Sequence, residues 1–121
     1  MKNVIYILFM AVLISNCATQ KKTKTITTKE LKTILDTKEI QLLDVRTPEE
    51  VGLGIIKDAK VINYFDEDFT EKSIDLIDKN KPVYVYCRTG NRSGKACEIL
   101  KEQGLDVINV EGGFSQWETE N

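Results

Sequence analysis

A regular alternation of short apolar runs with longer amphipathic segments constrains the fold of this chain more than any other feature of its sequence. The runs are IQLLDV (40–45), AKVIN (59–63), VYVY (83–86) and DVINV (106–110), and a short extended piece begins at Thr25. This alternation predicts an α/β fold in three layers, with a small central parallel sheet flanked by helices on both faces. Because VYVY is apolar or aromatic throughout, we expect it to be a central strand buried on both faces.

Signals for helix starts stand between these runs. Thr27 and Glu30 have the spacing of a capping box, and Pro48 stands where the first residue of a helix is expected. The acidic run at 65–69 is interpreted as the N-terminal turn of a helix rather than as a metal site. A longer helix is expected over 93–103. The residues expected to face the core from the helices are Leu31, Ile34, Leu35, Ile74, Ile77, Ala96, Ile99, Leu100, Phe114 and Trp117.

The N-terminal segment has the pattern of a secretory leader. Residues 4–14 are eleven consecutive apolar residues that follow Lys2. A helix that spans a bilayer needs about 20 such residues, so this run is too short to cross one, whereas it has the length of the apolar region of a signal peptide. We therefore predict a signal peptide over residues 1–16.

The end of the leader resembles the processing site of a bacterial lipoprotein. The residues LIS at 13–15 fit that pattern before Cys17, and Asn16 departs from the small residue that is usual there. The resemblance implies that Cys17 is lipidated, and the polar, lysine-rich stretch that follows is interpreted as a tether over 17–24. An extracytoplasmic, membrane-anchored lipoprotein is the location that we expect.

The composition removes several classes of function. The chain contains no histidine, which excludes a Ser-His-Asp triad, a Cys-His protease pair and any zinc site that needs imidazole. Its three cysteines cannot form a four-cysteine site, and we expect no metal and no cofactor. A net charge of −2 gives no basic excess for nucleic acid. The length and the 41% apolar content allow one small domain, which we place at 25–119.

The segment after the expected central strand carries the candidate chemistry, and it reads CRTGNRS (87–93). A glycine in a tight turn lets successive backbone N–H groups converge, and a helix N-terminus with nearby arginines adds positive charge. These influences favour a thiolate and are expected to hold the pKa of Cys87 below the usual value of about 8.5. Cys97 lies inside the next helix, where we expect a small core residue that is not bridged to Cys87.

Several segments in order resemble the motifs of a single-domain rhodanese, a sulfurtransferase family. They are LLDVRTPEE (42–50), YCRTGNRS (86–93), the helix that ends before Gly104, and VEGGFSQW (110–117). The resemblance implies that Cys87 is the nucleophile that becomes a persulfide. It assigns substrate binding to Arg88, Thr89, Gly90, Asn91, Arg92 and Ser93, with Arg88 and Arg92 contacting the sulfonate of the donor.

Other positions that match the family are given supporting roles. Asp44 and Arg46 are interpreted as a structural ion pair near a strand end, and Trp117 as a core residue. Ile55 replaces a histidine that the family usually carries after a glycine. Because sulfur transfer does not use that histidine as an acid or a base, we expect activity to survive the replacement.

The resemblance implies a sulfurtransferase that moves a sulfane sulfur from thiosulfate or a related anionic donor to cyanide or a thiol. A non-catalytic, membrane-tethered binding or sensing module is the alternative, and the intact Cys87 disfavours it. A cysteine-dependent phosphatase is a weaker alternative, because such enzymes place the arginine six positions after the cysteine whereas Arg92 follows at five. We expect a monomer that contacts a membrane through its anchor and does not bind nucleic acid.

Overall fold

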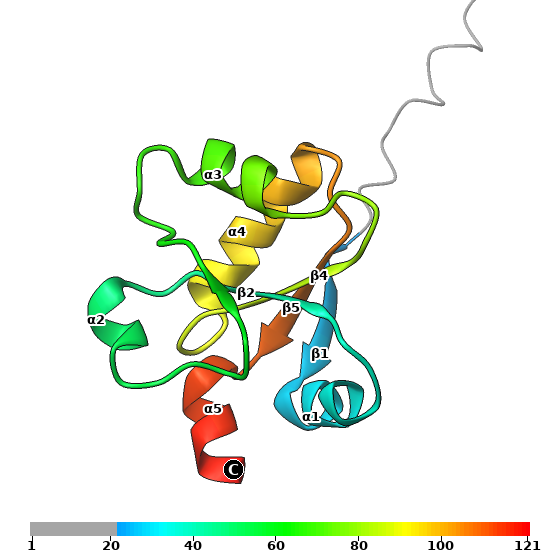
Figure 1. The fold of residues 1–121 in the computed structure, drawn as a ribbon, viewed down its shortest axis with the longest axis vertical. Coiled ribbons are helices and arrows are strands. Elements are labelled where there is room, and N and C mark those ends of the chain that lie inside the picture. Colours follow the sequence, from blue (N-terminus) through cyan, green and yellow to red (C-terminus); the bar gives the residue numbers. More distant parts are fainter. Residues whose placement is uncertain (1–21) are drawn as a thin grey trace, which may run out of the picture.

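The structure, a computed structural model, describes residues 22–121 (Figure 1). The predicted signal peptide at 1–16, the predicted lipidation site Cys17 and most of the predicted tether lie outside the described residues. Within 22–121, no helix is long and apolar enough to cross a membrane. The same residues contain no group of three acidic or cysteine side chains placed to hold a metal ion.

Five parallel strands form one sheet in the order β1-β5-β4-β2-β3. The strands are β1 (Lys24–Thr27), β2 (Gln41–Asp44), β3 (Lys60–Val61), β4 (Val83–Tyr86) and β5 (Val107–Glu111). The helices are α1 (Thr28–Thr37), α2 (Pro48–Val51), α3 (Phe69–Leu76), α4 (Asn91–Glu102) and α5 (Gly113–Glu120). The predicted α/β fold with a central parallel sheet is confirmed.

The sheet separates two apolar cores, and Figure 1 shows α1 and α5 on one side of it with α3 and α4 on the other. Strand β4 supplies both cores, because its side chains alternate between the two faces of the sheet. Val83 and Val85 pack with α3 and α4, whereas Tyr84 and Tyr86 pack with α1 and α5. All four residues of the strand are buried, as predicted for a central strand.

Some element ends differ from the predictions. The capping box predicted at α1 is half formed: the Thr27 hydroxyl accepts from the backbone N–H of Glu30, while the Glu30 carboxylate accepts from that hydroxyl. A complete capping box stands at α2, between Thr47 and Glu50. Helix α3 begins at Phe69, so most of the acidic run precedes the helix. The helix start there coincides with burial of the Phe69 side chain in the core.

Candidate active site

The topology brings two strand ends together at the carboxyl edge of the sheet. Strands β2 and β4 are neighbours, and Asp44 pairs in register with Tyr86. The segments that follow them, one leading to α2 and the other to α4, therefore start side by side. Ligands of open parallel sheets bind at this edge, which is where the predicted Cys87 loop lies.

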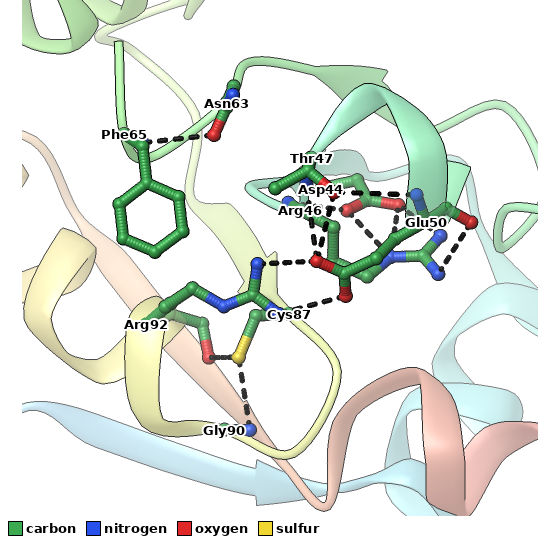
Figure 2. Close-up of polar contacts among 10 residues, drawn as sticks. Asp44, Arg46, Thr47, Glu50, Asn63, Phe65, Cys87, Gly90 and Arg92 are labelled. Carbon is green, nitrogen blue, oxygen red and sulfur yellow. Dashed lines mark hydrogen bonds and ion pairs between the residues drawn. The ribbon is translucent and has the colours of Figure 1, made fainter. Parts of the chain in front are cut away.

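The Cys87 side chain is buried at the end of β4 and is surrounded by hydrogen-bond donors (Figure 2). The backbone N–H of Gly90 donates to the Cys87 Sγ at 3.1 Å, and the hydroxyl of Ser93 lies 3.4 Å from the same atom. Burial alone would raise the pKa of Cys87, but hydrogen bonds from Ser93, Gly90 and Thr89 outweigh it and lower the pKa below that of an ordinary thiol. The predicted direction of the pKa shift therefore agrees with the geometry.

The turn between Cys87 and α4 depends on Gly90. Its φ of 113° lies in the left-handed region, which a residue with a Cβ rarely adopts. This conformation turns the backbone so that α4 begins at Asn91, two residues earlier than predicted, and it brings the Gly90 N–H toward the sulfur. Arg88, Thr89 and Asn91 are exposed on the outer surface of the turn.

The start of α5 holds the Cys87 loop from outside. The N–H of Phe114 donates to the Cys87 carbonyl at 2.8 Å, and the N–H of Ser115 donates to the Arg88 carbonyl at 3.0 Å. A Cβ at Gly113 would lie 2.4 Å from the Cys87 carbonyl oxygen, so the two backbones approach this closely only because Gly113 has no side chain. This role of Gly113 was not predicted from the sequence.

Asp44 and Arg46 form a buried ion pair beneath the site. The Arg46 Nη2 lies 2.7 Å from the Asp44 Oδ2, and the same nitrogen donates to the Gly54 carbonyl at 2.7 Å. The Arg46 guanidinium also lies 4.1 Å from the centroid of the Phe114 ring. Through these contacts Arg46 connects three parts of the domain: the end of β2, the segment that follows α2, and helix α5. An ion pair with these connections is suited to a structural role.

Arg92 pairs with Glu50, a residue that was not among the predicted site residues. The Arg92 Nη1 and Nη2 lie 2.7 Å and 2.9 Å from the two carboxylate oxygens of Glu50. Figure 2 shows the Arg92 side chain reaching from α4 toward Glu50 on α2. Arg92 was predicted to contact the sulfonate of the sulfur donor, and its guanidinium already has an anionic partner in Glu50. The position of Glu50 at the end of the segment 42–50 is the one sequence signal that could have indicated it.

Comparison with known proteins agrees with this geometry. The family model for the Rhodanese-like domain matches residues 27–120. The chain belongs to the rhodanese-like domain family. A solved structure, the rhodanese-like domain protein from Staphylococcus aureus, is 42% identical, with a TM-score of 0.71 over 78% of this chain and 91% of that one.

Relatives of this rhodanese-like chain include proteins named as sulfurtransferases. The putative sulfurtransferase YtwF of Bacillus subtilis is 42% identical over 98 residues, which are 80% of this chain and 92% of that protein. The thiosulfate sulfurtransferase GlpE of Shewanella oneidensis is 31% identical over 99 residues, or 81% of this chain and 95% of that protein. These relatives support a rhodanese-family sulfurtransferase.

Three other residues complete the description of this rhodanese-like domain. Cys97 is a buried free thiol in the same core as Cys87, and burial, followed by the negative charge of Cys87, raises the pKa of Cys97 to about 12. Cys97 is therefore a core residue and a poor nucleophile at neutral pH. Trp117 packs partly buried against the core on the α1 side. Ile55, at the position where the resemblance led us to expect a histidine, is exposed in the segment between α2 and β3.

Proposed function

We propose that this rhodanese-like chain transfers a sulfane sulfur through a persulfide on Cys87. The proposal rests on the surroundings of the Cys87 Sγ, which accepts hydrogen bonds from the Gly90 N–H and the Ser93 hydroxyl. These hydrogen bonds help to lower the pKa of the Cys87 thiol. These donors stabilise negative charge on the thiolate without a general base. A persulfide ends in a second sulfur anion, and the backbone N–H groups of the turn are suited to stabilise that charge as well.

The reaction proceeds in two displacements. In the first, the Cys87 thiolate attacks the outer sulfur of the donor, the sulfur–sulfur bond of the donor breaks, and the remainder leaves with the bonding electron pair. With thiosulfate the leaving group is sulfite. In the second, cyanide or a thiolate attacks the outer sulfur of the persulfide and Cys87 leaves as the thiolate. The name of the Shewanella oneidensis relative supports thiosulfate as one donor.

The lipidated Cys17 is proposed as the membrane anchor of this domain. It is supported by the length of the apolar run at 4–14 and by the residues LIS that precede the cysteine. In this proposal the domain operates outside the cytoplasm as a lipoprotein that is held at a membrane.

The intact mass of the protein after incubation with thiosulfate tests the sulfur-transfer proposal. We expect a gain of one sulfur atom on Cys87, its loss on addition of cyanide, and formation of thiocyanate. Cys87→Ser should abolish the gain, whereas the control Cys97→Ala should retain it. Hydrolysis of an aryl phosphate to the phenol and inorganic phosphate, with loss of that activity in Cys87→Ser and no sulfur uptake, would instead indicate a phosphatase.

A further inference from the structure

The Arg92–Glu50 ion pair lies beside the Cys87 turn and has consequences for the sulfur donor (Figure 2). The side chains of Arg92 and Glu50 are only 20% and 23% exposed. Both terminal nitrogens of Arg92 are used by Glu50, in the bidentate arrangement that gives the strongest pairing of arginine with a carboxylate. The pKa of Arg92 is raised mainly by the Glu50 hydrogen bond, against the opposing effect of burial, and then by the charge of Glu50. The negative charge of Cys87 makes a smaller contribution in the same direction. The guanidinium therefore lies within electrostatic range of the reacting sulfur.

Glu50 is fixed in place from its other side. The Thr47 hydroxyl donates to the Glu50 Oε1 at 3.1 Å, and the same two residues cap the start of α2. The hydrogen bond from Arg92 lowers the pKa of Glu50 to about 2. Burial opposes this shift, whereas the charge of Arg92 and the hydrogen bonds from Thr47 add to it. The carboxylate is consequently charged at every pH at which the protein would work.

The pair changes the charge that an incoming donor meets. The positive charge of Arg92 is balanced by Glu50. An anion is therefore attracted strongly to the Arg92 guanidinium only if it displaces the Glu50 carboxylate or shares the guanidinium with it. Thiosulfate carries two negative charges, so it loses the most attraction when Glu50 offsets the charge of Arg92. A donor with one negative charge or none meets a smaller penalty, because charge repulsion scales with the product of the charges.

An apolar side chain lies beside the pair. The Phe65 ring is 65% exposed, and its centroid is 5.8 Å from the guanidinium carbon of Arg92. An exposed aromatic ring at this place offers a contact to the carbon-containing part of an organic donor. It offers no comparable gain to thiosulfate, which has no apolar part.

We propose that Glu50 is a specificity-determining residue that holds Arg92 and selects organic sulfane-sulfur donors of low negative charge, such as alkyl persulfides, over divalent thiosulfate. The donor assignment rests on the sulfur-transfer function proposed above. The electrostatic effect of Glu50 on anions that approach Cys87 does not depend on that function, and it can be measured without any sulfur transfer.

Alkylation of Cys87 by two reagents of similar size tests the electrostatic selection in the full-length protein. Iodoacetamide is neutral and iodoacetate is an anion, so the ratio of their rates at Cys87, followed by mass spectrometry, reports the penalty on negative charge. Glu50→Gln should raise the iodoacetate-to-iodoacetamide ratio about fivefold, an effect of about 1 kcal/mol that added salt reduces. Glutamine keeps the capping-box pattern with Thr47, so α2 is expected to remain folded.

Glu49→Gln is the matched control, because it removes the same charge from the neighbouring, exposed position of α2. Its ratio should stay at the wild-type value. An unchanged ratio in Glu50→Gln, or an equal rise in both variants, would overturn the selection by Glu50 whatever reaction the protein catalyses.

Steady-state measurements then test the donor class. In Glu50→Gln we expect the KM for thiosulfate to fall about fivefold with little change in kcat, and the KM for an alkyl persulfide to change little. Phe65→Ala should raise the KM for the alkyl persulfide and leave that for thiosulfate unchanged. A higher KM for thiosulfate in Glu50→Gln would show that Glu50 serves only to position Arg92, and would overturn the proposal. If wild-type protein takes up sulfur from neither thiosulfate nor the alkyl persulfide, the sulfurtransferase function and this donor class are rejected. The alkylation ratio would still decide the role of Glu50.

Discussion

The Cys87 sulfur is subject to two opposing influences on its ionisation. Its burial removes water and favours the neutral thiol, while the N–H of Gly90 and the hydroxyl of Ser93 favour the thiolate. Cys97 lies in the same core and lacks such donors among the hydrogen bonds of the described residues, and burial raises its pKa to about 12. The two cysteines of the domain thus differ in reactivity because of their hydrogen-bond partners rather than their burial.

Ser93→Ala should raise the pKa of Cys87. Removing one hydrogen bond to the charged sulfur destabilises the thiolate relative to the thiol, and hydrogen bonds to charged groups contribute about 1.5–3 kcal/mol. The rate of alkylation by iodoacetamide follows the thiolate fraction, so the midpoint of its pH profile should lie below that of an ordinary thiol in wild-type protein and move to higher pH in the variant. Ser73→Ala, which removes a buried hydroxyl of α3 that donates to the Phe69 carbonyl, is the control. Coincident pH profiles for wild type and Ser93→Ala would contradict the expectation.

At this scale the sequence predicted the segment 87–93, because a cysteine, a glycine and two arginines lie between a strand and a helix. Glu50 and Gly113 were missed for different physical reasons. Glu50 is forty-two positions from Arg92, and nothing local to either residue specifies their contact. Gly113 is important because it lies against the backbone of Cys87 and Arg88, and this close approach depends on the pairing of β5 with β4.

Helix α5 acts on the site through backbone contacts rather than through a reactive side chain. Its first residues donate to the carbonyls of Cys87 and Arg88, and so fix the end of β4 and the beginning of the turn. The rest of the helix packs on the core beside α1. The position of the sulfur is therefore set by three elements: β4, α4 and α5.

Gly113→Ala should destabilise the protein and move the Cys87 loop. A Cβ there would meet the Cys87 carbonyl oxygen at 2.4 Å and the Arg88 carbonyl carbon at 2.6 Å, at a φ of +55°. We expect a loss of about 3 kcal/mol or more in the free energy of unfolding, with slower alkylation of Cys87. Gly104→Ala is the matched control, because its φ is +84° with nothing within 4 Å, and it should cost about 1–2 kcal/mol of conformational strain alone. Equal losses in the two variants, measured by urea unfolding, would show that the close approach is unimportant.

The types of the elements were predictable and their ends were less so. Strand β4 matched its prediction at both ends, because an unbroken apolar run is closed by the cysteine and preceded by a proline. Helix α4 began two residues early, since the start depends on the left-handed conformation of Gly90 rather than on the apolar spacing that the prediction used. Strand β3 covers only Lys60–Val61, which is shorter than the predicted run at 59–63, and it pairs only with β2 at an edge of the sheet.

On the scale of the whole molecule, the alternation of apolar and amphipathic segments predicted the three layers and the parallel direction of the strands. It did not predict the strand order β1-β5-β4-β2-β3, because pairing between distant strands of similar composition has no local signal. That order places β4 at the centre of the sheet with the reactive turn at its carboxyl end. The family motifs carried the information on the site that the periodicity lacked.

The proposed anchor is also a property of the whole chain. Growth of cells with labelled palmitate should mark the wild-type protein, and Cys17→Ala should lose the label because the variant lacks the sulfur that would carry the lipid. Cys97→Ala, which changes a buried thiol in the domain, should keep the label. Label on the Cys17→Ala protein would contradict the lipoprotein assignment, and the sulfur-transfer proposal would be unaffected.

The parallel arrangement of β1 gives the domain an orientation relative to any attachment at its N-terminus. Strand β1 starts at Lys24 and reaches the reactive edge only at Thr27, which pairs in register with Glu111, two residues before α5, the helix whose start holds the Cys87 loop. The polypeptide thus enters the domain at the end remote from the sulfur. In the proposed lipoprotein the tether would join the domain on the side away from Cys87, so that the attachment itself would leave the reactive face open to solutes and partners.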